Sequence, residues 1–563
     1  MSRSIWPSNH IGDVCLWSIM CRFLLVSLNI EAILGEVTIG QRRKKLEEMA
    51  RGNGLSDAYT ATLARLKGQK GNKSVLGLKV LIWVVYSRRP LRASELCHAL
   101  AVEFGSLDLD PKNVPALRTL LASCLGLVTI EASSSTVRLV HFTLQEHLLS
   151  NTTLFHSPHV AIAEVCLTYL NFRSVLDLLP TLSSAPSTMP LLEYSSLYWG
   201  KHLSMGMTEN VKMLALRLLD RFDEHISAQL LLLHYNEDRG PGPYFDSWGG
   251  PTGFSGLHGV SFLGITEIVV AVLEMKEWDV NATDCVGGTA LTWAAMRGNG
   301  EVVSILLKRG DVNLDQPDTD YGRTPLSWAS VNGHEEVVKM LLEREGVNPN
   351  QTDTSDHWTP LLHAVWHRKD RVVKVLLERE DVNPNQADSI YGRTPLWCAA
   401  GCGFDELVRM LLEREDVDPN QTDAENGWTP LLWATLRMHK SVVKMLLGRE
   451  DVNPNYADSI YGQTPLWWAA ERGYDELAMM LLEREDIDLN QADTVYGQTP
   501  LSCAAWWGNV NLVKMLTERN NVRIAMLDNY NQTPLSLALS RGHDEVVRIL
   551  QGNTNSHPID RRG

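Results

Sequence analysis

The stretch that decides the fold is TPLWCAAGCGFDELVRMLLERE at residues 394–415, because variants of it recur through half of the chain. Its opening Thr-Pro-Leu triplet returns after 35 residues five times in succession and then after 34 residues. A constant period of this length is typical of a solenoid, in which each repeat stacks on its neighbours. The triplets begin at Thr324, Thr359, Thr394, Thr429, Thr464, Thr499 and Thr533.

Each repeat reads as two helices followed by a loop. The Thr hydroxyl can cap the free amides of a first helix, and Pro suits its first position. Apolar residues at helical spacing, as in 406–412, predict a second helix, and the Asp, Asn and Pro residues of 378–386 predict a projecting loop. Glycines able to adopt positive φ stand where the first helix should end: Gly298, Gly333, Gly403, Gly473, Gly508 and Gly542.

This order of helix, turn, helix and projecting loop, with Thr-Pro-Leu and Asp-Val-Asn in their places, resembles the ankyrin repeat from about Phe254 to Leu550. The resemblance implies a solenoid of about eight to nine units, with a degenerate unit around Gly256 at its start. The usual ankyrin unit has about 33 residues. We therefore place the two additional residues of each copy in the projecting loop, between Asp388 and Thr394, and expect its tip to reach farther.

Two departures from the ankyrin pattern carry expectations of their own. Arg368 and Met438 replace the helix-ending glycine, so we expect a looser turn in those two repeats. The His that usually follows the triplet is also missing, and we expect its customary hydrogen-bond ladder to be lost. The residues found there instead are Thr292, Ser327, Leu362, Trp397, Leu432, Trp467, Ser502 and Ser536.

The composition is that of an ordinary soluble protein, with 563 residues, of which 44% are hydrophobic and 21% charged. The formal charge of −15 opposes general attraction to nucleic acid or anionic lipid. Nine scattered cysteines, none in a Cys-x-x-Cys pair, indicate reduced thiols in an intracellular compartment. The apolar run Val14–Leu34 is divided by Arg22, so we expect a buried helix there and no membrane span.

The front half has a different pattern, in which three helices precede a β-hairpin and a further helix. The apolar and polar periodicity predicts helices over 80–86, 92–102 and 114–122, and strands over 126–130 and 136–140. Thr143 and Glu146 form a capping-box sequence at the start of the next helix. Three helices and a hairpin are typical of a winged helix, and amphipathic stretches over 156–240 predict a helical spacer after it.

Two motifs, Arg89-Pro-Leu before 95–101 and Val140-His-Phe-Thr-Leu-Gln-Glu-His-Leu, resemble the winged-helix domain that follows the NACHT ATPase in fungal NLR-like (STAND) proteins. Those proteins often end in ankyrin repeats, and the resemblance reaches back to about Arg22. The fold expected is mainly α. Its expected regions are 1–57, a remnant of the NACHT end and linker helix; 58–155, the winged helix; 156–250, the helical spacer; 251–551, the ankyrin repeats; and 552–563, a disordered tail.

The NACHT motor itself is not found. A nucleotide-binding loop must end in Gly-Lys-Ser/Thr, and the only Gly-Lys is Gly200-Lys201, which His202 follows. The stretch 68–74 has Asn72 where such a loop requires Gly, so it reads as a polar linker. His141 matches the position where related winged helices place a His against bound ADP. Without a phosphate site, we favour its packing between the hairpin and the next helix, and we predict no cofactor.

Other candidates for chemistry are weaker than their structural interpretations. A lipase-like hydrolase, which also carries a similar winged helix, would need Gly-x-Ser-x-Gly, and the chain has none. His363 and His367 lie one helical turn apart without a third metal ligand, and Cys398 and Cys402 read as packed thiols. The basic run at 42–45 reads as a solvated helix face and not as a nuclear import signal. We predict no catalytic residue, no metal site and no nucleic-acid or membrane partner.

The residues that differ between repeats at the loop tips and first-helix ends are the natural contact set of a solenoid. Tyr, Trp and Arg are enriched at binding hot spots, so these positions predict a protein or peptide ligand on the concave surface. For Trp293, Trp328, Trp433 and Trp468 we favour packing between helices. The predicted contact set is Arg297, Tyr321, Trp358, Trp366, His367, Tyr391, Trp428, Arg437, Tyr461, Arg472, Tyr496, Trp506, Trp507 and Arg541.

The leading hypothesis is a protein-interaction scaffold without enzymatic activity, located in the cytoplasm or, alternatively, in the nucleus. In it the ankyrin array binds a ligand, and the front half connects the array to signalling or self-association in an NLR-like fungal system. The rival is the sensor portion of a signalling NTPase whose P-loop domain lies in a longer product or in a partner chain. A third alternative is a degenerate paralogue.

Overall fold

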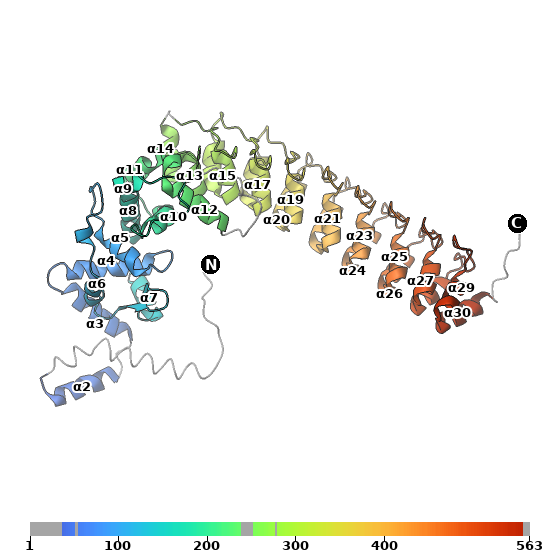
Figure 1. The fold of residues 1–563 in the computed structure, drawn as a ribbon, viewed down its shortest axis with the longest axis horizontal. Helices are drawn as coiled ribbons and strands as arrows, with labels where there is room; N and C mark the ends of the chain where they lie inside the picture. The colour runs from blue at the N-terminus through green and yellow to red at the C-terminus, as the bar shows by residue number, and fades with distance from the viewer. Residues whose placement is uncertain (1–36, 51–54, 152, 238–250, 276–277, 555–563) are drawn as a thin grey trace. The chain divides into compact units, whose positions relative to one another are not determined.

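The computed structural model describes residues 37–50, 55–151, 153–237, 251–275 and 278–554 (Figure 1). The expected apolar helix at Val14–Leu34 and the tail residues 555–563 lie outside this range. The chain divides into two units, residues 1–285 and 286–563, and the fold is mainly helical in both. No helix in the described ranges is long and apolar enough to cross a lipid bilayer.

The first unit contains the predicted winged helix. Strands β1 (Val128–Glu131) and β2 (Thr136–Leu139) pair antiparallel, with Val128 opposite Leu139. The backbone before the second helix joins this hairpin, since the amide of Val137 donates to the carbonyl of Leu91 over 2.8 Å. The helices are α2 (Ile39–Ala50), α3 (Leu55–Lys67), α4 (Lys73–Tyr86), α5 (Ala93–Ala101), η1 (Pro111–Asn113), α6 (Leu117–Ser123) and α7 (Phe142–Ser150).

The start of α7 differs from the capping box expected at Thr143 and Glu146, and that expectation is wrong. The helix begins at Phe142, and the capping residue is His141, whose Nδ1 accepts a hydrogen bond from the amide of Thr143 over 3.3 Å. The same Nδ1 lies 2.8 Å from the Thr143 hydroxyl, which in turn lies 2.8 Å from the hydroxyl of Tyr59. His141 therefore links the hairpin to the following helix by hydrogen bonds, in agreement with the structural role that the sequence analysis favoured for it.

The predicted helical spacer is present and well packed. Its core includes Tyr194, Trp199 and His202, which are all fully buried. Its helices are α8 (Pro158–Leu170), α9 (Arg173–Leu176), α10 (Leu192–Leu203), α11 (Glu209–Leu219), η2 (Phe222–Glu224) and α12 (Ile226–Glu237). The degenerate first repeat follows as α13 (Gly256–Leu263) and α14 (Thr266–Glu274), separated by Gly264 at a φ of 74°.

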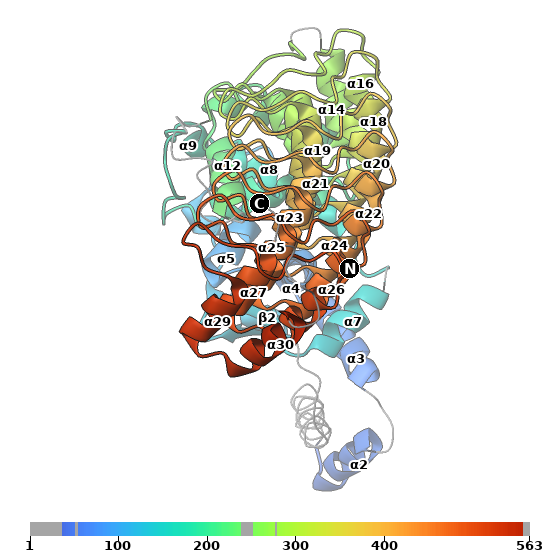
Figure 2. The same ribbon diagram turned by 90° about the vertical axis from the view of Figure 1, so that its right-hand side faces the viewer.

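The second unit is a row of eight helix pairs that stand side by side, with a projecting loop between each pair and the next (Figure 1, and Figure 2 along the row). The first helices are α15 (Ala290–Arg297), α17 (Pro325–Asn332), α19 (Pro360–Trp366), α21 (Pro395–Cys402), α23 (Pro430–Leu436), α25 (Pro465–Arg472), α27 (Pro500–Trp507) and α29 (Pro534–Arg541). The second helices are α16 (Gly300–Leu307), α18 (Glu335–Leu342), α20 (Asp370–Leu377), α22 (Asp405–Leu412), α24 (Lys440–Leu447), α26 (Asp475–Leu482), α28 (Val510–Thr517) and α30 (Asp544–Thr554).

The start of each first helix follows from its Thr-Pro sequence. The Thr324 hydroxyl accepts the amide of Ser327 over 3.2 Å while Pro325 occupies the first helical position, and every triplet threonine repeats this arrangement. A cap of this kind contributes about 1 kcal/mol. These first helices have only seven or eight residues and are too short to be stable by propensity alone, so the cap adds stability that they need.

The turns at Arg368 and Met438 are as tight as the glycine turns, so the expectation of looser turns there is wrong. Both residues adopt the left-handed backbone, with φ of 51° and 61°. The amide after each donates five residues back, His439 to Ala434 over 2.9 Å, just as Asn299 donates to Ala294 over 3.0 Å in a glycine turn. Packing between repeats therefore imposes the turn even where a side chain disfavours it.

The core of the row lies between successive helix pairs. Small residues of the first helices, such as Ala329 and Ala364, and branched residues of the second helices, such as Val338 and Val373, have no exposed surface. A single pair could not bury these faces, so its neighbours complete the core.

Two hydrogen-bond ladders that the sequence reasoning did not foresee connect the repeats. In one, an Asn side chain bridges to the next repeat: the amide nitrogen of Asn385 donates to the Asp416 carbonyl over 2.6 Å, and its oxygen accepts the Asp418 amide over 2.8 Å. Asn350, Asn420, Asn455 and Asn490 do the same.

The second ladder is formed by arginines that follow the second helices. The guanidinium of Arg414 pairs with Asp416 and also donates to the Arg379 carbonyl of the preceding repeat over 2.8 Å. Arg379, Arg449 and Arg484 likewise donate to carbonyls of the preceding repeat. These carbonyls end a helix or follow it, so the arginines satisfy acceptors that the helix leaves without a partner.

We expect Met438→Gly to stabilise the array, because glycine adopts the left-handed backbone without a Cβ clash and the Met438 side chain is largely exposed. The gain should be about 0.5–1 kcal/mol, after the entropy that glycine adds to the unfolded chain. Gly473→Ala, at a φ of 66°, should instead lower stability by about 1 kcal/mol. Urea unfolding followed by tryptophan fluorescence measures both, and equal effects of the two substitutions would contradict this account.

We expect Asn420→Ala to destabilise the array by about 1–2 kcal/mol, because it removes hydrogen bonds to the Asp451 carbonyl and the Asn453 amide. The neighbouring Gln421→Ala is the matched control, since the Gln421 side chain makes no hydrogen bond within the described residues. Hydrogen exchange of the amides around Asn453 should accelerate in Asn420→Ala alone. Unchanged exchange there would show that the ladder adds nothing to stability.

Candidate protein-binding surface of the repeat array

The projecting loops are held rigidly, and this fixes the direction of the tyrosines at their tips. In one loop the buried carboxylate of Asp388 accepts the amides of Ile390, Tyr391 and Arg393. The Tyr391 carbonyl then accepts the amide of Ala424 in the next loop over 2.7 Å. With the backbone fixed on both sides, the ring stands outward, and the exposed fractions of Tyr391, Tyr461 and Tyr496 are 41, 48 and 47%.

Most consecutive loops are joined in the same way, by one backbone hydrogen bond at the tip. Thr319 donates to Val286, Thr354 to Tyr321, Ser459 to Asn426, Thr494 to Tyr461 and Asn529 to Tyr496. The histidine ladder whose loss was expected is thus replaced by backbone bonds and by Thr and Ser hydroxyls, such as Ser327 against Thr324 at 3.2 Å. The tips form one continuous edge that can present several side chains to a ligand at once.

Tyr321 differs from Tyr391 because the arginine that lies over its ring is buried against the next repeat. The Arg323 guanidinium carbon is 4.8 Å from the Tyr321 ring centre and 5.0 Å from that of Trp328. Arg323 is itself buried, and its Nε lies 3.2 Å from a carboxylate oxygen of Asp353 in the next repeat. Tyr321 is therefore only partly exposed, and this end of the edge is more closed than the Tyr391 end.

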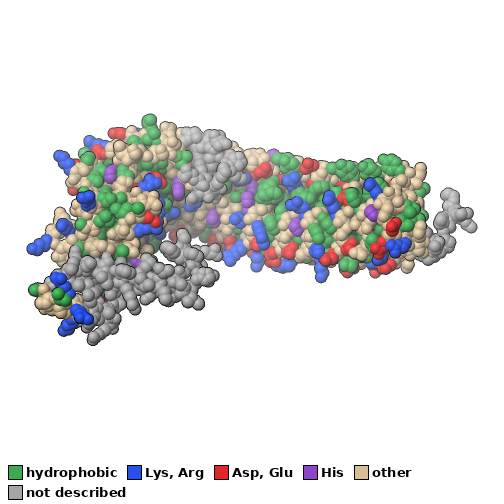
Figure 3. Space-filling model, turned by 60° about the horizontal axis from the view of Figure 1, so that its bottom comes forward, with side chains coloured by type: hydrophobic (Ala, Val, Ile, Leu, Met, Phe, Trp, Pro, Cys, Tyr) green, Lys and Arg blue, Asp and Glu red, His purple; other side chains and the backbone are tan. Residues whose placement is uncertain are grey.

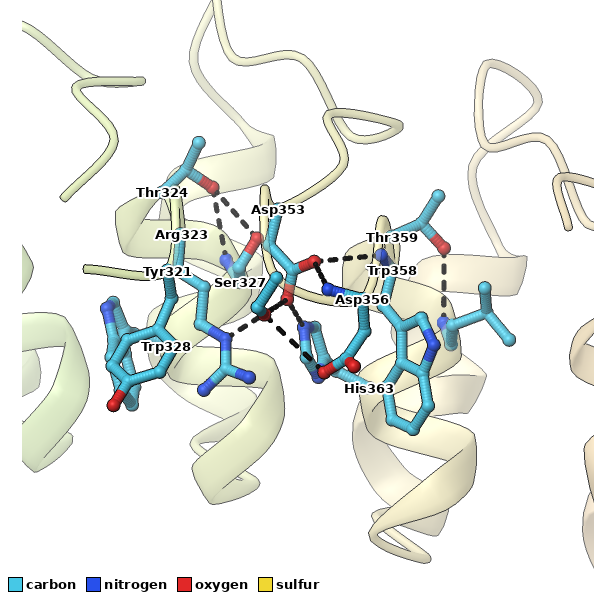
Figure 4. Close-up of polar contacts among 12 residues, drawn as sticks. Tyr321, Arg323, Thr324, Ser327, Trp328, Asp353, Asp356, Trp358, Thr359 and His363 are labelled. Carbon is cyan, nitrogen blue, oxygen red and sulfur yellow. Dashed lines mark hydrogen bonds and ion pairs between the residues drawn. The ribbon is translucent and has the colours of Figure 1, made fainter. Parts of the chain in front are cut away.

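Asp353 is the centre of a buried polar network, shown in Figure 4. One carboxylate oxygen accepts the amides of Asp356 and Trp358 over 3.1 and 3.0 Å. The other lies 2.8 Å from Nε2 of His363 and 3.2 Å from Nε of Arg323. The network joins two neighbouring repeats by charges that have almost no contact with water.

The network also sets the protonation of its members. Burial raises the pKa of Asp353, but hydrogen bonds from His363 and the Trp358 amide, with the positive charge of Arg323, outweigh burial and hold that pKa well below 3.8. Burial is the largest influence on His363 and lowers its pKa below 6.5, although the hydrogen bond to Asp353 opposes it. At neutral pH we therefore take Asp353 as ionised and His363 as neutral, donating from Nε2.

The metal interpretation of His363 and His367 gains no support from their geometry. The two rings stack with centres 6.4 Å apart and an angle of 11° between their planes, and Nε2 of His363 is already engaged by Asp353. In the described ranges no group of three or more His, Cys, Asp or Glu side chains is arranged to hold a metal ion. Desolvation of its inner side and the nearby His363 lower the pKa of His367 to about 4 although the residue is exposed, so it too is neutral at pH 7.

Tryptophans from two repeats form a stack in the middle of the array. Trp433 lies between Trp397 and Trp428, with ring centres 5.3 and 4.9 Å apart and nearly parallel planes. The indole NH of Trp397 donates to the Trp428 carbonyl over 3.0 Å. Trp433 therefore packs between repeats, as the sequence analysis favoured. The sequence analysis did not identify Trp397 as part of this stack. The position of Trp397 directly after the Leu of the triplet could have indicated that it packs between repeats.

The ends of the first helices carry the largest exposed aromatic side chains of the array. Trp366 and Trp507 have exposed fractions of 43 and 54%. Trp506 is half-buried because Arg541 of the next repeat covers it, with its guanidinium carbon 3.5 Å from the ring centre. Trp293 and Trp328 are buried, in agreement with the packing interpretation.

The structure thus sorts the predicted contact set by exposure, although no ligand tests it. The half-buried members are Tyr321, Trp358, Trp428 and Trp506. The exposed members are Arg297, Trp366, His367, Tyr391, Arg437, Tyr461, Arg472, Tyr496, Trp507 and Arg541. Figure 3 shows one face on which hydrophobic side chains run along the repeats with Lys and Arg side chains between them.

We expect the protonation state of His363 to appear as a pH dependence of local stability. Because its pKa is lowered in the folded chain, acid protonates the unfolded chain first, and stability falls as the pH drops below about 6.5. The loss for this one group cannot exceed about 1.4 kcal/mol for each pH unit. Hydrogen exchange of α17 and α19 amides at pH 7 and 5 measures it.

His363→Gln keeps a donor for Asp353 without titrating, so its pH dependence should be flatter than that of the unchanged chain. Equal slopes for the two proteins would show that His363 is not buried in its neutral form.

Comparisons with known proteins agree with this architecture. The family model described as "Ankyrin repeats (3 copies)" matches six overlapping segments, 257–353, 344–423, 361–458, 415–493, 441–526 and 485–560, which together span more than half of the chain. The model described as "GPI inositol-deacylase, winged helix domain" matches residues 62–158.

Among solved structures, the crystal structure of the ankyrin repeat domain of Bcl-3, a member of the IkappaB protein family, is similar at 26% identity. The match covers 41% of this chain and 99% of that chain, with a TM-score of 0.36. No curated protein matches the sequence. The extent of the repeat match decides the assignment: the chain belongs to the ankyrin-repeat family.

Proposed function

We propose that this protein is an intracellular recognition scaffold that binds a protein or peptide ligand along the loop tips and first-helix ends of its ankyrin repeats. Ankyrin repeats support a role in protein–protein interaction, and that broad role follows from the family. The finer proposal concerns the surface used. It is supported by one observation above all, the row of outward tyrosines on a backbone that Asp side chains and cross-loop hydrogen bonds hold in place.

The physical reason is the small entropic cost of binding to such a surface. Tyr391, Tyr461 and Tyr496 stand on fixed backbone, so a ligand has only their side-chain torsions to order. Tyr and Trp bury large areas and can also donate a hydrogen bond, which is why they dominate binding hot spots. Trp366 and Trp507 add apolar area at the first-helix ends.

The cellular setting belongs to the proposal as well. The winged helix of residues 62–158 before an ankyrin array supports an NLR-like protein of the NACHT-associated type. In this proposal the front half connects ligand binding to signalling or self-association in the cytoplasm. The 563 residues contain no Gly-x-x-x-x-Gly-Lys-Ser/Thr loop, so any nucleotide-driven step would require a P-loop domain from a longer product or a partner chain.

We expect the tip tyrosines to decide which proteins the full chain captures. The test is affinity capture from a cell extract followed by quantitative mass spectrometry, with the unchanged chain and with Tyr391→Ala combined with Tyr461→Ala and Tyr496→Ala. Specific partners should fall at least tenfold in the triple variant, because truncation of a hot-spot residue costs about 2 kcal/mol or more.

Tyr456→Ala is the matched control, because Tyr456 is equally exposed, at 42%, but lies outside the predicted contact set. Partners retained by the triple variant and lost with Tyr456→Ala would overturn the proposal, and so would a set of partners that neither change affects.

A further inference from the structure

The first helices of the second unit carry an excess of positive charge that the protein as a whole does not share. Across these eight helices and the turn residues that end them, the only carboxylate is Glu471. The same positions hold five arginines, in a chain whose formal net charge is −15. We call them the arginine row: Arg297, Arg368, Arg437, Arg472 and Arg541.

Three members of the row are not neutralised by the protein itself. In the part of the chain that the structure describes, Arg368, Arg437 and Arg541 form no ion pair. Nε of Arg472 lies 3.3 Å from a carboxylate oxygen of Glu471, which leaves the terminal nitrogens of Arg472 for a ligand. By contrast, five of the seven arginines that lie two residues after a second helix pair with an Asp two residues later, as Arg379 does with Asp381. The others of this kind are Arg309, Arg414, Arg449 and Arg484. The array thus pairs most of the arginines after its second helices and leaves most of those at its first-helix ends without a carboxylate partner.

Aromatic rings hold the guanidinium groups of the row. The guanidinium carbon of Arg437 lies 5.0 Å from the ring centre of Trp433, that of Arg472 lies 5.7 Å from Trp468, and that of Arg541 lies 3.5 Å from Trp506. Arg368 lies 5.4 Å from the ring centre of Phe404. A guanidinium on a ring keeps its edge donors for an acceptor, and it is ordered before the ligand arrives.

We propose that the ligand segment bound along the first-helix ends is an acidic extended peptide, whose carboxylates pair with Arg437, Arg472 and Arg541. This inference rests on the proposed function and names the chemistry of its partner. Neighbouring helices pack about 8–10 Å apart, and an extended chain advances about 3.3 Å per residue. An acidic residue at about every third position would therefore meet one repeat after another.

Charge also favours a peptide over a nucleic acid. Exposed carboxylates of Asp320, Asp356 and Glu425 stand at the loop tips of the same array. A continuous phosphate backbone, with one charge per nucleotide, would be repelled along this edge, whereas a peptide can leave neutral residues opposite it. Single-stranded nucleic acid is nevertheless the informative competitor, because Arg and Trp also bind unstacked bases.

The test uses the full chain and a fluorescein-labelled 12-residue peptide with Glu at every third position and Ala and Ser between. Fluorescence anisotropy at low salt should show binding that weakens about tenfold when every Glu is replaced by Gln, and that falls with added salt. Arg437→Gln with Arg472→Gln and Arg541→Gln should abolish the preference for Glu over Gln. Circular dichroism checks that this triple variant is folded.

The control variant loses the same net charge, but from arginines outside the row. Arg371→Gln with Arg409→Gln and Arg548→Gln removes three arginines from the second helices α20, α22 and α30, and it should leave the preference for Glu intact. Equal loss in the two triple variants would overturn the inference, because total charge and not the row would then be responsible. Equal affinity for the Glu and Gln peptides would overturn it too, as would tighter binding of oligouridine than of the Glu peptide.

These outcomes are distinguishable from failure of the proposed function. If the tyrosine variants lose their captured partners while the arginine triple variant retains them, the recognition scaffold stands and the acidic ligand does not.

Discussion

The structure of the repeat array depends on the contact between one helix pair and the next. Each pair is too short to be stable alone, and residues such as Ala329 and Val338 are buried because neighbouring pairs complete their surroundings. This contact is strong enough to impose a left-handed backbone on Arg368 and Met438. It also brings the loop tips close enough for the backbone bonds that fix Tyr391 and its equivalents.

Much of the fold could be predicted because it depends on local chemistry. Thr-Pro at residues 324–325 determines a cap and a first turn, and Gly403 determines a helix end. The hairpin of the winged helix followed from alternation and a polar turn. The start of α7 was predicted two residues too late because capping by His141 depends on the position of its ring, which sequence spacing does not reveal.

The candidate surface was less predictable than the fold. Tyrosines at the loop tips were identified from their period, but the difference between Tyr321 and Tyr391 depends on Arg323, which turns inward to Asp353 of the next repeat. The guanidinium carbon of the equivalent Arg393 lies 4.0 Å from the ring centre of Tyr391, and Arg393 remains partly exposed. Two arginines with the same neighbours in sequence thus differ in burial, and only the side chains of the adjacent repeat decide which one is buried.

The Asn and Arg ladders have a mechanical consequence. Each rung is shared by two neighbouring repeats, so an interior repeat is held from both sides and a terminal repeat from one side only. A pulling force applied to the carboxyl end would therefore peel repeats away one at a time. The array would behave as an extensible spring that lengthens in steps of one repeat and recoils when the load is released.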